Sequence, residues 1–239
     1  MKKILTYGIF ILLIGFGIFL FSFSAVKNKS KKVHDVAIHF TSNDHSFLTK
    51  KMVNKLLIQN HGAIKNQPKS VIDLQGLEQR IVSNPYVEEA KVYLTIDGAL
   101  RVGIKQRTPI ARISSGNDVY YIDKQGIKIP VSQNYSSRVL LVNGVFDAKG
   151  LKEITSFINA IINDEFLNKE VVGVVKNAEN EFELSARSGK HKIDFGNLDL
   201  IQVKFKKIKA FYKRTYRDKT IESYKRINVK YRNQIVCTK

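Results

Sequence analysis

The residues that most readily carry enzyme chemistry, histidines and carboxylates, are scattered along this 239-residue sequence. The five histidines are His34, His39, His45, His61 and His191. His34 and His39 fall at opposite parity on a predicted strand, so their side chains point to opposite faces and cannot bind one metal ion. The sequence also lacks HExxH, GxSxG, Walker and GxGxxG motifs. It therefore predicts no catalytic residues, no metal and no cofactor.

Two carboxylates lie beside glycine at predicted turns. Asp123 precedes Gly126 and could be a candidate catalytic carboxylate, but an aspartate in this position also shapes a hairpin turn, and we favour that interpretation. Asp194 lies in IDFGN, at a predicted change from strand to helix, where glycine permits the turn. Both residues are expected to be structural, and the chain is predicted not to be an enzyme.

A more informative pattern is the segment INVKYRNQIV near the C-terminus, residues 227–236. Its residues alternate between two faces of a predicted strand: Ile227, Val229, Tyr231, Asn233 and Ile235 on one, and Asn228, Lys230, Arg232, Gln234 and Val236 on the other. A terminal strand often forms a sheet edge, where unpaired backbone groups invite another chain. We therefore expect an edge strand here.

Two interpretations of this edge are equally supported by the residues alone. Outward Lys230 and Arg232 could protect an edge that binds nothing. Alternatively, a partner segment pairs with the backbone, the two cations attract its acidic residues, and Tyr231 packs as an anchor.

The net charge of +19 is concentrated near the C-terminus, where Ile201–Lys239 holds 13 Lys or Arg against Asp218 and Glu222. Such a segment suits nucleic acid, anionic lipid or an acidic protein, or is simply a solvated face. Nucleic acid is not expected on the far side of a membrane.

An uncharged run of 23 residues, Ile4–Val26, follows Lys2 and Lys3 and precedes a lysine cluster at residues 27–32. As a helix it reaches roughly 35 Å, enough to cross a bilayer core of about 30 Å. A cleaved signal peptide is the alternative, but its apolar part is usually shorter. We expect an uncleaved anchor with the N-terminus in the cytoplasm.

The single cysteine, Cys237, excludes an internal disulfide framework.

The first region after the anchor reads β-α-α-β-β. A strand is predicted over 33–40, a helix over 49–59 capped by Thr49 or Ser46 and ended by Gly62, and a second helix over 73–83. Two strands, 87–96 and 100–113, meet at Asp97-Gly98, a strong hairpin signal.

The second region is predicted to be a mixed β domain. A hairpin over 119–131 and a strand over 139–144 precede a helix from Asp147 to about Asn168. Three short strands then span 171–177, 181–187 and 191–196. An amphipathic helix over 199–216 is expected to turn Leu200, Val203, Ile208, Phe211 and Tyr212 inward.

The order of these pieces resembles the bacterial cell-division family FtsQ, also called DivIB. The stretch NPYVEEAKVYLTIDGALRVGIKQRTPIARI carries the family arrangement at Pro85, Val87, Ala90, Val92, Leu100, Val102, Pro109 and Ala111. YYIDKQG, IDFGN and the final INVKYRNQIV are also similar to the family. The resemblance implies an α+β chain: an anchor region at 1–32, a POTRA-like domain at 33–113, and a β domain at 114–239 that ends in a partner-binding edge strand.

The resemblance also implies a non-enzymatic, single-pass scaffold of the divisome at the septum. It would lie in the cytoplasmic membrane with most of the chain outside the cytoplasm. It would hold FtsB-like and FtsL-like proteins by pairing a partner strand with Ile227–Val236, chiefly at Tyr231 and Lys230, and could contact other divisome components through the POTRA-like domain. The alternative is a membrane-anchored POTRA chaperone that binds extended client polypeptides.

Overall fold

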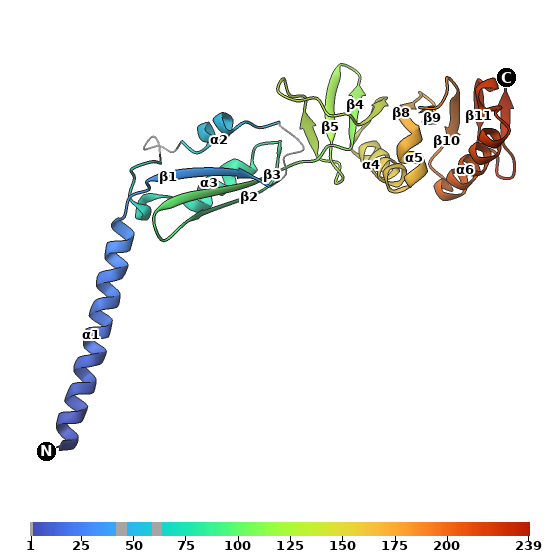
Figure 1. Cartoon of the computed structure of the whole chain (residues 1–239). Helices are drawn as coiled ribbons and strands as arrows, with labels where there is room; N and C mark the ends of the chain where they lie inside the picture. The colour runs from blue at the N-terminus through green and yellow to red at the C-terminus, as the bar shows by residue number, and fades with distance from the viewer. Residues whose placement is uncertain (1, 42–46, 59–63) are drawn as a thin grey trace. The chain divides into compact units, whose positions relative to one another are not determined.

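The computed structural model describes residues 2–41, 47–58 and 64–239, so Ser46, His45, His61 and Gly62 lie outside the described residues. The chain forms two compact units, Met1–Gln106 and Arg107–Lys239. Figure 1 shows the elements of each. The predicted boundary at 113/114 differs from this division, because Ala111–Ser115 forms β4, which pairs with strands of the second unit.

The first unit begins with helix α1 (Lys2–Ser30). Among the described residues, this is the one helix long and apolar enough to span a membrane, over Tyr7–Asn28. The described side chains of its apolar stretch are exposed. An apolar helix without a protein partner can bury its side chains in lipid, so the finding is consistent with a membrane anchor.

The rest of the first unit has the predicted β-α-α-β-β order. Its elements are β1 (Asp35–Phe40), α2 (Lys50–Leu56), the 3-10 turn η1 (Lys69–Val71), α3 (Leu74–Val82), β2 (Val87–Leu94) and β3 (Ala99–Gln106). Within the described residues the strands follow the order β1-β3-β2, with β1 parallel and β2 antiparallel to β3. Both predicted helix starts are confirmed, since Thr49 accepts a hydrogen bond from Met52 N and Asp73 accepts one from Gly76 N.

Residues 107–239, all of which are described, form a nine-stranded sheet. Its order is β12-β11-β10-β9-β8-β7-β4-β5-β6. The strands beyond β4 are β5 (Asp118–Ile122), β6 (Lys128–Pro130), β7 (Leu140–Asn143), β8 (Val171–Lys176), β9 (Phe182–Ala186), β10 (Lys192–Gly196), β11 (Arg226–Asn228) and β12 (Val236–Thr238). The helices are α4 (Ala148–Asn163), α5 (Glu165–Glu170) and α6 (Ile201–Arg217), followed by the 3-10 turn η2 (Ile221–Ser223).

The core of the second unit lies between its sheet and the helices α4 and α6. Phe157 of α4 is fully buried, and its ring centre lies 4.8 Å from that of Phe195 on β10 and 6.1 Å from that of Phe205 on α6. Helix α4 stops at Asn163, where the prediction continued to about Asn168. Asp164 interrupts it because its side chain accepts hydrogen bonds from Phe166 N and Leu167 N and so starts α5.

The inward face of α6 is rotated from the predicted one. Ile208 and Tyr212 are buried as expected and Phe211 is partly buried. Leu200 and Val203 were expected inside but are 60% and 42% exposed. Lys204 and Phe205 occupy the buried positions instead, because the Lys204 ammonium group caps the Asn197 carbonyl at 2.7 Å.

The predicted continuous edge strand over residues 227–236 is wrong. Strand β11 ends at Asn228, and the chain reverses over 229–235 before β12 pairs antiparallel with β11. On its other side β11 pairs in parallel with β10. The chain's own backbone therefore covers β11 on both sides, and β12 is the edge.

Candidate functional site

The C-terminal hairpin of β11 and β12 is the candidate interaction site, because it places a strand at the end of the sheet (Figure 1). Its register pairs Arg226 with Thr238, Ile227 with Cys237 and Asn228 with Val236. On the other side of β11, Lys192 N donates to Lys225 O and Val229 N donates to Asp194 O.

These bonds establish which backbone groups face outward. The Lys225 C=O and the Val229 N–H both bond to β10, and in a parallel ladder every second residue faces the same neighbour, so the backbone groups of Ile227 also face β10. The backbone groups of the alternate residues, Arg226 and Asn228, therefore face β12. Their partners Thr238 and Val236 consequently face β11. The backbone N–H and C=O of Cys237 point away from the sheet, where a further strand could pair with them.

The loop between the two strands is held by side chains from neighbouring elements. The ammonium group of Lys207 on α6 donates to Val229 O at 2.7 Å and also to Tyr231 O. Asn228 accepts a hydrogen bond from Lys230 N at 3.0 Å, which starts the turn. These bonds, together with the buried side chain of Val229, explain why the chain turns here rather than continuing as a strand.

Gly196, at the end of β10, lets this loop approach closely. Its φ is +74°, in the left-handed region, and a Cβ there would meet Lys230 Cγ at 2.7 Å. The stem of Lys230 lies across this glycine, and its ammonium group reaches Glu181 Oε2 at 2.9 Å. The Glu181 carboxylate, by accepting this hydrogen bond, raises the pKa of Lys230.

The structure separates the ten predicted site residues into two groups. Ile227 and Val229 are buried and Asn228 and Ile235 are partly covered, so these four support the hairpin. The exposed ones are Lys230, Tyr231, Arg232, Asn233, Gln234 and Val236. Tyr231 is 51% exposed, as an anchor residue must be before binding. The edge residues Cys237 and Thr238 were missed, although the β-favouring sequence Val-Cys-Thr was a signal for them.

Ion pairs between side chains join this hairpin to the adjacent strands. Arg226 on β11 pairs with Glu183 Oε2 at 2.9 Å and also with Asp194 on β10. Asp194 is therefore a structural carboxylate, as predicted. Because Lys230 is paired with Glu181, Arg232 is the cation of loop 229–235 that makes no ion pair among residues 107–239 and is open to an acidic partner.

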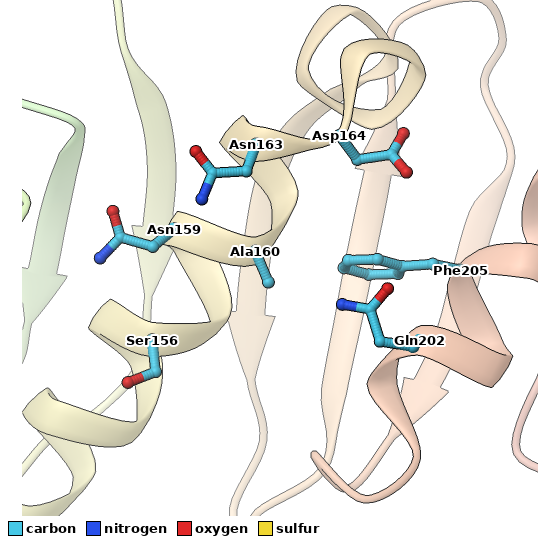
Figure 2. A pocket seen from close by; sticks show the side chains of 7 residues that line it. All are labelled: Ser156, Asn159, Ala160, Asn163, Asp164, Gln202 and Phe205. Carbon is cyan, nitrogen blue, oxygen red and sulfur yellow. The ribbon is translucent and has the colours of Figure 1, made fainter.

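The hollow in Figure 2 lies between α4 and α6 and measures about 520 Å³. Ala160, Gln202 and Phe205 face this space, whereas Asn159 is turned away and donates to Lys124 O. The carboxylate that lines this hollow belongs to Asp164, which accepts a hydrogen bond at the start of α5 and pairs with Lys209 Nζ at 2.5 Å. Because this carboxylate is already bonded on both oxygens, the hollow does not present a nucleophile beside a free general base.

A second polar cluster lies inside the second unit. His191 is buried, and its Nε2 lies 2.5 Å from the hydroxyl of Tyr212. Burial lowers the pKa of His191 and raises that of Tyr212. Within the described residues, no three His, Cys, Asp or Glu side chains come together in a way that could hold a metal ion. The cluster therefore supports the packing of α6.

Together, an N-terminal helix long and apolar enough to span a membrane, a β-α-α-β-β unit and a β unit with an open edge define the class of architecture to which this chain belongs. A family model described as FtsQ/DivIB, C-terminal related, matches residues 108–238, and a POTRA-like domain matches residues 31–105. The chain belongs to the FtsQ/DivIB family, as the resemblance implied. No curated protein matches the chain. Family membership indicates a cell-division scaffold with an α+β fold.

Proposed function

We propose that this chain is a non-enzymatic, single-pass scaffold of the bacterial division machinery that holds FtsB-like and FtsL-like partners by strand addition. The observation that carries the proposal is the position of β12 at the end of the sheet, with the backbone of Cys237 facing outward. A strand added there gains main-chain hydrogen bonds, while side chains beside it supply specificity. The binding segment is therefore Val236–Thr238 together with the preceding loop.

The exposed loop residues support this mode of binding. Tyr231 offers an aromatic surface beside the edge, and Arg232 offers a charge that attracts an acidic partner segment. Lys230 acts indirectly, since its pair with Glu181 positions the loop. Ile227 and Val229 contribute by packing in the core.

The membrane part of the proposal rests on α1. A long domain that follows an apolar span is translocated largely regardless of the lysines after the span. The N-terminus then stays in the cytoplasm, and both folded units lie outside it, at the division septum.

Proline at Cys237 tests strand addition directly. Cys237→Pro removes an outward N–H without removing a hydrogen bond between β11 and β12. Cys237→Ala keeps that N–H and is the matched control. We expect the proline variant of the full chain in lipid nanodiscs to bind an FtsB–FtsL-type pair at least about tenfold more weakly than the alanine variant, a loss of about 1.4 kcal/mol.

Thermal unfolding of both variants verifies that the sheet is intact. Equal partner affinity of the two variants, at equal stability, would show that β12 does not receive a strand. Partner capture without β12 would then have to use another surface of the chain.

A second candidate function is binding of extended clients by the POTRA-like unit. It is favoured by β1, which lies at the edge of the described three-stranded sheet. On the opposite edge, Glu78 accepts a hydrogen bond from Val92 N at 3.0 Å, so that donor is occupied. A peptide array separates the functions: one dominant acidic segment supports the scaffold, whereas weak binding of many unrelated extended peptides supports the chaperone.

A further inference from the structure

The turn between β2 and β3 exposes an apolar residue that the fold does not use. Ile96 is 83% exposed, and it lies in a turn closed by a hydrogen bond from Gly98 N to Thr95 O. Turns favour glycine, proline, asparagine, aspartate and serine, so turn chemistry does not call for isoleucine here. Ile96 also lies outside the core of its unit, so its side chain is free to enter an apolar environment outside the protein.

Backbone bonds tie this turn to the segment that leaves the membrane helix. The apolar span of α1 ends at Asn28. His34 N donates to Gly98 O, and the Lys32 carbonyl lies so close to Gly98 that a Cβ there would meet it at 2.9 Å. Four residues from Asn28 to Lys32 cover at most roughly 14 Å. The turn is therefore held close to the membrane surface by chain length alone.

Lys69 adds a second connection between the turn and α1. Its ammonium group donates to Thr95 O at 2.7 Å and to Ile96 O at 2.9 Å, and it lies 3.4 Å from Asn28 Oδ1. Ile96 also lines a hollow of about 490 Å³ together with residues of α1 between Phe21 and Asn28 and with Lys31 just after the helix. The turn thus lies beside the last apolar residues of the span.

Most charges around the turn are basic, and the acid within the turn, Asp97, lies 3.8 Å from His34 Nε2. Lys31 and Lys32 are exposed and follow the span directly, and Lys69 lies at the turn itself. Lysines next to a membrane span attract anionic headgroups, while an apolar side chain among them can enter the boundary between headgroups and acyl chains.

We propose that the β2–β3 turn docks on the bilayer that α1 spans, with the Ile96 side chain inserted into the headgroup boundary and the lysines around it contacting anionic lipid. The inference rests on the membrane anchoring that is part of the proposed function. Docking would give the POTRA-like unit a second attachment to the membrane and limit its rotation about the end of α1.

The sequence contains no tryptophan, so one introduced tryptophan reports on a single position. Ile96→Trp places the probe in the turn. Val82→Trp is the matched control, because Val82 is also apolar and 41% exposed but lies next to the opposite end of β2. The eight residues of β2 separate that end from the turn by about 27 Å.

The full-length variants are reconstituted into vesicles of phosphatidylcholine and phosphatidylglycerol, with and without brominated acyl chains. For Ile96→Trp we expect emission at shorter wavelength, a loss of intensity with brominated lipid, and protection from iodide in the water. For Val82→Trp we expect quenching by iodide and none by brominated lipid. Vesicles of phosphatidylcholine alone should weaken the effect at Ile96.

Vesicle flotation measures anchoring separately. If the chain floats with the vesicles but Ile96→Trp behaves like Val82→Trp, docking of the turn is overturned and the anchor stands. If the chain does not float, the membrane anchor fails and the docking inference fails with it.

Discussion

Arg107 and Asp123 form a buried ion pair in the second unit, with 2.8 Å between Arg107 Nη1 and Asp123 Oδ2. Their side chains are only 14% and 4% exposed. The other carboxylate oxygen of Asp123 accepts hydrogen bonds from Gln125 N and Ile127 N, both at 2.9 Å. The pair therefore joins the first residue of this unit to the turn between β5 and β6, and Asp123 shapes the turn as predicted.

Asp123→Asn should strongly destabilise the second unit. The substitution removes the charge that compensates Arg107, and breaking one side of a buried pair costs about 3–5 kcal/mol. Denaturant unfolding measures the effect. Asp118→Asn in the same hairpin is the control, since Asp118 is exposed and should change the unfolding free energy by no more than about 0.5 kcal/mol. Equal midpoints for both variants would mean that the ion pair contributes nothing.

The buried His191 should make the second unit sensitive to acid. Its pKa is lowered below 6.5 by burial, which outweighs the opposite effect of Glu170, and its Nε2 lies against the hydroxyl of Tyr212. Below about pH 6.5 the unfolded chain gains a proton that the folded chain does not, so the free energy of unfolding falls as the pH falls. Above that pH the contribution is fully present.

Thermal unfolding between about pH 8 and pH 5 tests this dependence. His191→Gln keeps a polar group beside Tyr212 but does not titrate. In this variant the unfolding temperature should fall less between about pH 8 and pH 5 than in the unmodified chain. A decline of the same steepness in the variant would assign the acid sensitivity to other groups.

Lys207→Met should loosen the loop between β11 and β12. The substitution keeps the apolar stem but removes the donor to Val229 O and Tyr231 O, and a hydrogen bond from a charged group contributes about 1.5–3 kcal/mol. We expect faster amide hydrogen exchange over residues 229–233 and weaker binding of the partner. Lys206→Met, at an exposed position on the same helix, should leave both unchanged. Unaltered exchange in Lys207→Met would mean that the loop is held by other contacts.

Arg232→Glu should slow association with an acidic partner without altering the fold. Arg232 is exposed and makes no ion pair within the fully described residues 107–239, whereas Lys230→Glu would also break the pair with Glu181. Stopped-flow association at low and high salt gives the measurement. The difference from the unmodified chain should shrink at high salt, because ions screen exposed charges. A reduced association rate that does not depend on salt would contradict electrostatic steering.

Local signals predicted much of the fold correctly. Thr49, Asp73 and Asp147 each begin a helix with their side chain on a backbone N–H, and Asp97-Gly98 lies in the turn of a hairpin. These features depend on residues close in sequence. The order of the elements and the resemblance of the whole chain then led to the correct family.

The C-terminal hairpin could not be predicted in the same way, because distant residues determine it. Alternation from Ile227 to Val236 is equally compatible with one strand or two short ones. The choice depends on Lys207, which lies 22 residues before Val229, and on Asp194 O, which binds Val229 N. The rotated face of α6 has a similar origin, since the buried Lys204 finds its hydrogen-bond acceptors on Asn197, which lies before the helix.

The hydrogen bond from Val92 N to Glu78 has a consequence for self-association. A sheet that is open at both edges can add copies without limit, as aggregating β proteins do. The Glu78 side chain occupies an outward donor of β2, so a second sheet cannot complete its ladder on that side. Pairing of the three-stranded sheets of two chains through β1 would consequently end at a pair of sheets.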